Sequence, residues 1–257
     1  MSPSIDIAET LWRAHNDPSG GHEQALSSAD LSALTVPQGQ QIQLALLQRW
    51  LDQGETLGGW KIGMTSGANR NAMGDNIRPF GFILSNRIKT ATDRLSVSRL
   101  HRGQIENELC FLIKEPLGSG ATATQAAACV TAVLPAFEIN QKRLPADSPA
   151  ALRVADNLSN WGICIGEPVA PPATLSDLTV SLSGAQGLIE QISSEGHIDE
   201  HYDSLAVLAN TLSTYGYRLE PGQYVITGAY GKTPFAPGTY VGDFDQGIGR
   251  VHVHLDA

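Results

Sequence analysis

Hydrophobic residues follow two different periods along the chain. In residues 39–55 they recur at helical spacing, so that Leu46 and Trp50 fall on one face of a helix. Further on, apolar residues form short runs bounded by glycine and proline, which is typical of β-strands. The change of period predicts a helical N-terminal segment, residues 1–57, followed by a catalytic β-rich domain, residues 58–257.

Strand-like runs dominate the second part of the chain. Two helical segments, residues 122–134 and 203–216, interrupt them without the regular β–α alternation of a doubly wound sheet. The pattern therefore predicts an α+β fold with a mostly-β core. Residues 140–157 form the most polar connection and are expected to be a surface or active-site loop. The candidate strands are residues 58–66, 80–88, 106–113, 136–140, 162–170, 178–184, 187–193, 223–230 and 249–256.

Composition narrows the class of protein. The chain has 257 residues, of which 42% are hydrophobic and 17% charged, and no apolar run approaches the roughly 20 residues of a membrane span. Its N-terminus lacks the basic start and apolar core of a signal peptide, so we expect a cytoplasmic protein without a membrane partner. A formal net charge of −9 without a basic stripe argues against a nucleic-acid partner.

The three cysteines give no sign of a disulfide framework or a zinc site. Cys110, Cys129 and Cys164 each lie in an apolar run, without C-x-x-C spacing. We expect them to be reduced thiols in the core.

Two glutamates stand in an otherwise hydrophobic strand, "IENELCFLI". Because side chains alternate along a strand, Glu106 and Glu108 point the same way. They can lie on the solvated face of an edge strand, or they can be buried and need a cation or a shared proton. Cys110 and Leu112 continue the same face and argue for burial. Mg2+ and Mn2+ prefer oxygen ligands and would neutralise the pair.

Two further charged residues lie in apolar strands. Glu138, in "PAFEIN", is either a surface residue or a third carboxylate for the same ion, with Pro135 marking the entry to its strand. Lys61, in "GGWKIGMTSG", is either a lysine that extends to solvent or a group that binds a substrate anion and transfers protons.

Six motifs in order carry a resemblance to a known family. The chain resembles the hydratase/decarboxylase branch of the fumarylacetoacetate hydrolase superfamily, whose members act in aromatic catabolism. The E-x-E pair followed about thirty residues later by F-E-I is the specific part of the match. The motifs are "WKIGMTS", "RPFGFIL", "IENEL", "LPAFEI", "VADNLS" and "VITGAYG".

The resemblance implies a mixed β-roll-like core and a homo-oligomer. It implies a Mg2+ or Mn2+ ion bound by Glu106, Glu108 and Glu138, with Lys61 as the catalytic residue. The expected function is a metal-dependent lyase, a hydratase that acts on a short linear 2-hydroxydienoate or 2-oxoalkenoate through a metal-bound enolate. The expected substrate-binding residues are Thr65, Ser159 and Thr227.

Three departures from the family pattern leave the reaction open. Pro79 stands where hydratases of the group carry an aspartate, and His101 lies one residue further from Glu106 than in the decarboxylases. The usual H-P-L before the late helix is also changed. Decarboxylation of a 2-oxo-3-enedioate, hydrolysis of an acylpyruvate and a non-catalytic role therefore remain alternatives. Arg78 is a candidate for binding a distal carboxylate, and Glu55, Asp75 and His101 are candidates for a base that activates water.

Overall fold

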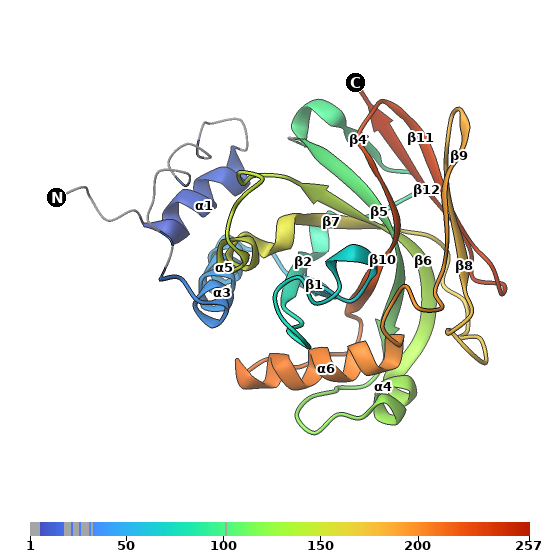
Figure 1. Ribbon diagram of the computed structural model, residues 1–257, viewed down its shortest axis with the longest axis horizontal. Helices are drawn as coiled ribbons and strands as arrows, with labels where there is room; N and C mark the ends of the chain where they lie inside the picture. Colours follow the sequence, from blue (N-terminus) through green and yellow to red (C-terminus); the bar gives the residue numbers. More distant parts are fainter. Residues whose placement is uncertain (1–5, 18–21, 23–25, 27–30, 32, 101) are drawn as a thin grey trace.

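Two β-sheets form the centre of the molecule (Figure 1). The computed structural model describes residues 6–17, 22, 26, 31, 33–100 and 102–257. The larger sheet has seven strands in the order β2-β1-β10-β5-β6-β7-β3, and the smaller has five in the order β4-β12-β11-β8-β9. The strands are β1 Leu57–Ile62, β2 Phe80–Leu84, β3 Ile88–Thr90, β4 Arg94–Ser96, β5 Gly103–Ile113, β6 Val130–Gln141, β7 Asn160–Ile165, β8 Thr179–Gly184, β9 Gly187–Ser193, β10 Tyr224–Pro234, β11 Gly238–Phe244 and β12 Gly249–Asp256.

Both sheets mix antiparallel and parallel pairs. Most neighbouring strands are antiparallel, whereas β1 with β10, β3 with β7 and β4 with β12 are parallel. The smaller sheet packs through β11 and β12 against β6, and through β8 and β9 against β10. This arrangement confirms the predicted α+β fold with a mixed, mostly-β core.

Helices cover the larger sheet in two groups (Figure 1). One group contains α1, α3 and α5, in which α3 packs against both other helices and against β2. The other contains α4 and α6, which pack together, with α6 against β10 and β1. Thr35 caps α3, because its side chain accepts from the backbone of Gln38 while the Gln38 side chain returns to Thr35. The helices are α1 Ile7–Asn16, α3 Val36–Asp52, α4 Ala123–Cys129, α5 Ala150–Ala155 and α6 His201–Thr214.

The helix predicted over residues 122–134 is shorter than expected. It ends at Cys129, and the chain continues directly as β6. The residues that follow the helix include the β-branched Val130 and Val133, which favour a strand. Pro135 consequently lies inside β6 and does not mark its start.

Several other predictions concern the core and the chain ends. Cys110, Cys129 and Cys164 are buried free thiols, as expected. In the described residues no helix is both long enough and apolar enough to cross a membrane. The helices α1 and α3 precede the first strand, and the division into residues 1–57 and 58–257 stays a prediction.

Candidate active site and metal centre

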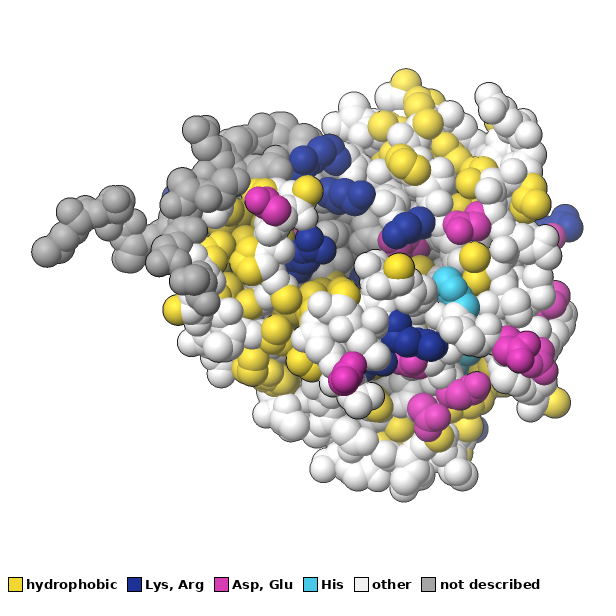
Figure 2. All heavy atoms as spheres, viewed as in Figure 1, with side chains coloured by type: hydrophobic (Ala, Val, Ile, Leu, Met, Phe, Trp, Pro, Cys, Tyr) yellow, Lys and Arg dark blue, Asp and Glu magenta, His cyan; other side chains and the backbone are white. Residues whose placement is uncertain are grey.

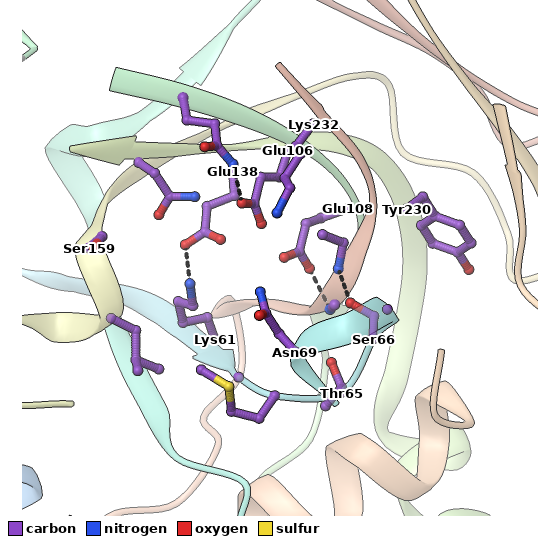
Figure 3. A pocket seen from close by; sticks show the side chains of 18 of the residues that line it. Lys61, Thr65, Ser66, Asn69, Glu106, Glu108, Glu138, Ser159, Tyr230 and Lys232 are labelled. Carbon is purple, nitrogen blue, oxygen red and sulfur yellow. Dashed lines mark hydrogen bonds and ion pairs between the residues drawn. The ribbon is translucent and has the colours of Figure 1, made fainter. Parts of the chain in front are cut away.

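Three carboxylates converge on one face of two neighbouring strands. Glu106 and Glu108 point to the same face of β5, and Glu138 lies directly opposite Glu106 in the antiparallel ladder with β6. One carboxylate oxygen from each residue lies within 4.8 Å of the others. Figure 3 shows the three side chains directed toward one another. The structure therefore brings together the glutamates that the sequence singled out.

Three ionised glutamates at this place are energetically unfavourable without a counter-ion. Only 3% of Glu108 and 1% of Glu138 is exposed. Burial raises the pKa of Glu106 and Glu108, and the adjacent Glu138 carboxylate raises it further. Carboxylate oxygens clustered in this way are the ligand set that hard divalent cations prefer, so the residues present fit a Mg2+ or Mn2+ ion.

Lys61 lies at the end of β1, beside the glutamates (Figure 3). Its ammonium group donates to Oε1 of Glu138, and Nδ2 of Asn160 donates to the same oxygen at 2.7 Å. Burial favours a lower pKa for Lys61, but the negative charges of the three glutamates outweigh it and raise the pKa above its ordinary value. The lysine is thus a buried cation at the edge of the carboxylate cluster.

A cavity of about 400 Å³ opens over this cluster, a size suited to a small organic acid. Its walls come from the end of β1, the loop of residues 63–69, β5, β6 and β10. Lys61, the three glutamates, Thr65 and Ser159 all line it. Strands and a loop from distant parts of the sequence therefore meet at one site.

Thr227 takes a different place from the one expected. It is completely buried and does not belong to the cavity wall. Its hydroxyl forms a 2.7 Å hydrogen bond with Nδ1 of His201, and its carbonyl accepts from the Thr65 hydroxyl at 2.8 Å. Thr227 thus lies behind Thr65 and supports it, rather than facing the cavity.

Gly228 shapes the wall beside Glu108. Its backbone N–H donates to Oε2 of Glu108, where the pairing of β10 with β5 is irregular. Its φ of +139° is in the region that favours glycine, and a Cβ here would lie 2.4 Å from Oγ1 of Thr65. Only glycine fits between the Glu108 carboxylate and the threonine.

A strained turn supplies another part of the wall. The residues of Asn157–Ser159 all have positive φ values, between 52° and 65°. The Asn157 side chain holds the turn by accepting from the N–H of Phe82 at 2.7 Å and donating to its carbonyl at 2.9 Å. Leu158 and Ser159 are thereby directed to the cavity.

The residues before this turn are fixed by a buried polar network. Asp156 accepts from Nε of Arg143 at 2.8 Å and contacts Nε2 of His15 at 3.1 Å. Burial and then the positive charge of Arg143 lower the pKa of His15 to about 4. At neutral pH the contact between His15 and Asp156 is therefore a hydrogen bond of a neutral imidazole. The network connects α1 to the cavity wall.

Arg78, the candidate for binding a distal carboxylate, lies away from the cavity. Arg78 is bound to Asp199, with Nε 2.8 Å from Oδ2, and it does not line the cavity. The structure therefore contradicts its proposed role at a distal carboxylate.

The candidate bases are also absent from the described wall. Glu55 and Asp75 do not line the cavity, and His101 lies outside the described residues. Two residues that were not singled out and whose side chains can act as a base, Glu190 and His197, do line it. They come from β9 and the loop after it, and no local pattern marks them.

Comparisons with known proteins agree with this architecture. No family model matches the chain. It is 28% identical over 77% of its length to a 4-oxalocrotonate decarboxylase of a Pseudomonas species, covering 77% of that protein. It is 26% identical over 79% of its length to the 2-oxo-hept-4-ene-1,7-dioate hydratase of Escherichia coli, covering 80% of that protein.

A solved structure shows the same fold over nearly the whole chain. The 4-oxalocrotonate decarboxylase from Pseudomonas putida G7, complexed with magnesium and adipate, superposes with a TM-score of 0.84 at 23% identity. The superposition covers 97% of this chain and 96% of the other. Fold and sequence likeness together confirm the resemblance of this chain to the hydratase/decarboxylase branch of the fumarylacetoacetate hydrolase superfamily.

Proposed function

We propose that this protein is a divalent-metal-dependent lyase that acts on a short linear 2-oxo acid. The convergence of three glutamates, of which Glu108 and Glu138 are buried, with Lys61 in one cavity carries the proposal. The names of the relatives, which are hydratases and decarboxylases, support it.

Glu106, Glu108 and Glu138 would hold the ion, for which Mg2+ and Mn2+ are the candidates. When bound, the ion would act as a Lewis acid that stabilises negative charge developing on the keto oxygen of a 2-oxo acid. Hydrogen bonds from Lys61 and Asn160 to Oε1 of Glu138 orient this carboxylate, as the Gly228 N–H does for Glu108.

Lys61 is the candidate for proton transfer. It is buried, lines the cavity and carries a proton that is now donated to Glu138. A substrate placed beside Glu138 would bring its carboxylate, or the enolate carbon that accepts a proton, within reach of the same ammonium group. Leu158 contributes an apolar wall that limits water at the reacting end.

Hydration of a 2-hydroxydienoate or 2-oxoalkenoate is the leading reaction. It needs an acid or base in addition to Lys61, and Glu190 and His197 supply titratable groups in the wall. Nε2 of His197 lies 3.0 Å from the carbonyl oxygen of Ala229, which can only accept, so Nε2 is the donor. Nδ1 of a neutral His197 is then the basic nitrogen.

Decarboxylation of a 2-oxo-3-enedioate is the second candidate. Pro79 favours it, because a proline has no side-chain group that can activate water where hydratases of the group carry an aspartate. Its carbonyl is already occupied by the N–H of Gly63 at 2.7 Å.

One assay separates the two reactions. The purified protein with Mg2+ or Mn2+ is incubated with a panel of 2-hydroxydienoates and 2-oxo-enedioates, while dienol absorbance and CO2 release are followed separately. Hydration consumes the dienol without CO2, and decarboxylation releases CO2. A Glu138→Gln variant serves as the matched control and is expected to lose turnover with either substrate. Absence of metal-dependent turnover across the panel would contradict the proposal.

The assembly and location of the protein extend the proposal. We infer a cytoplasmic homo-oligomer, supported by the family resemblance and by the exposed apolar residues Leu188 and Ile189 on the edge strand β9. Light scattering at micromolar concentration tests the assembly, and a mass equal to the 27.4 kDa chain would contradict it.

A further inference from the structure

The cavity floor continues beyond the glutamates along β6. Side chains two residues apart share a face, so Glu138, Asn140 and Lys142 form a row, and all three line the cavity. On β5, Gln104 lies opposite Asn140 as Glu106 lies opposite Glu138. At about 3.3 Å per residue, the backbone of Lys142 lies roughly 13 Å from that of Glu138. The row leads from the carboxylates, past a pair of amides, to a cation.

The amide of Asn140 has no partner in the described part of the chain. Only 6% of the residue is exposed, and Oδ1 is buried without a hydrogen bond. Gln104, which lies opposite Asn140 in the ladder, does have a partner, because its Nε2 donates to Oε1 of Glu106 at 2.7 Å. A carboxylate can only accept hydrogen bonds, so the atom of Asn140 that suits it is Nδ2, which also forms no hydrogen bond among the described residues. An amide N–H without a partner in a cavity wall indicates a position for an accepting ligand group.

Two cations near this end lack anionic partners among the described residues. Lys142 follows directly after β6, and its ammonium group forms no ion pair there. Arg153 of α5 donates Nε to the carbonyl of Ser148 at 3.0 Å and Nη2 to that of Ala146 at 2.7 Å. These neutral acceptors hold the guanidinium in place without neutralising it.

The other two lysines of the wall are matched by carboxylates. Lys61 is bound to Glu138, and Lys232 lies opposite Glu106 in the ladder between β10 and β5. The charge of Lys232 also acts on Glu106, whose pKa it lowers in part. The unmatched positive charge is therefore confined to Lys142 and Arg153.

The charges of the whole cavity lead to the same conclusion. Among the described wall residues, lysine and arginine contribute four positive charges and glutamate four negative ones, so a divalent ion would leave two positive charges for the ligand to match. The chain carries a net charge of −9, yet Lys and Arg side chains gather in the middle of the face shown in Figure 2. Asp and Glu are more numerous toward its lower right.

We propose that Asn140, Lys142 and Arg153 form a second anion subsite, and that the substrate is a short linear 2-oxo diacid. One carboxylate and the keto group lie at the glutamates, and the distal carboxylate lies at this subsite. Arg153 supplies a fixed donor, Asn140 a hydrogen bond and Lys142 a mobile charge. The inference rests on the proposed function, because it assumes that the 2-oxo acid end binds at the metal.

Binding of two saturated analogues tests the subsite. Because 2-oxohexanedioate and 2-oxohexanoate have the same chain length and no alkene, they differ only in the distal carboxylate. Calorimetry with the Mg2+-loaded protein is expected to show tighter binding of the diacid by roughly tenfold. Lys142→Met should remove most of this preference and leave the monoacid affinity unchanged, and Lys142→Glu should reverse it. Lys114→Met, an exposed lysine outside the cavity, is the matched control.

The outcomes separate failure of the subsite from failure of the function. Equal affinity of the two analogues for the parent protein, or an unchanged preference in Lys142→Met, would overturn the subsite and leave the lyase proposal standing. Failure of both analogues to bind in the presence of Mg2+ would overturn the proposed function itself.

Discussion

Lys61 is held where burial and charge have opposite effects. Burial disfavours its ammonium form, whereas the three glutamates favour it more strongly and keep the group protonated. Its hydrogen bond to Glu138 also fixes the direction of one candidate metal ligand. The residue can therefore affect catalysis through proton transfer, through orientation of the ligand, or through both.

Replacing Lys61 by methionine removes the proton and the hydrogen bond together, so turnover and metal affinity are measured separately. Lys61→Met keeps the length and apolar part of the side chain but removes the proton, so we expect turnover to fall by about 10²–10⁴. Calorimetric Mn2+ affinity should be unchanged or higher, because a positive charge beside the ligands is lost. Lys114→Met should behave like the parent. Turnover within a few-fold of the parent would show that Lys61 has a structural role only.

At the scale of elements, Asn157–Ser159 connects α5 to β7 in a conformation that its residues rarely adopt. Leu158 at a φ of 52° is unfavourable without support. The two hydrogen bonds between Asn157 and the backbone of Phe82 in β2 supply that support. Because the turn carries Ser159 into the cavity, the strain is coupled to the shape of the site.

Loss of this support should affect both stability and substrate binding. Asn157→Ala removes both hydrogen bonds and places alanine at a φ of 57°, so we expect unfolding free energy to fall by about 2–4 kcal/mol. KM should rise, because Ser159 loses its position. Urea unfolding and steady-state kinetics measure the two effects, with the exposed Asn86→Ala as control. A variant of parental stability and KM would show that the turn is held by other contacts.

At the scale of the whole molecule, two buried histidines connect helices to the rest of the fold, His15 to the residue after α5 and His201 to β10. His15 of α1 contacts Asp156, and His201 of α6 contacts Thr227 and Tyr230 at 2.7 Å each. Burial lowers the pKa of each histidine to about 4. Both helices are thus packed around neutral imidazoles.

The contribution of these histidines to the free energy of unfolding should therefore decrease in mild acid. A histidine with a pKa near 6.5 in the unfolded chain and about 4 in the fold binds more protons when unfolded. Its contribution is fully present above pH 6.5 and is lost as the pH falls toward 4. For His201 the loss at pH 5 is about 2 kcal/mol.

Urea unfolding at pH 7.5 and pH 5 measures this effect as the difference between the parent and His201→Gln. The comparison is needed because the raised pKa of Glu106 and Glu108 contributes with the opposite sign. An equal change of stability with pH in both proteins would contradict the prediction.

Local properties of the chain were enough to predict much of this molecule. The change from helical to strand period identified the class of fold, and alternation within β5 put Glu106 and Glu108 on one face. Side-chain direction in a strand follows from the backbone of that strand alone. The family motifs then identified Lys61 and Glu138, because their order along the chain is itself sequence information.

Contacts between residues far apart in sequence could not be predicted from local properties of the chain. Glu138 faces Glu106 through the β5–β6 register, Lys61 reaches Glu138 across 77 positions, and Arg78 is bound to Asp199 across 121 positions. Pairing and packing across such separations depend on how all strands and helices fit together. Neither local period nor charge therefore reveals that Arg78 is occupied. For the same reason, the unmatched cations beside Asn140 appear only in the folded chain.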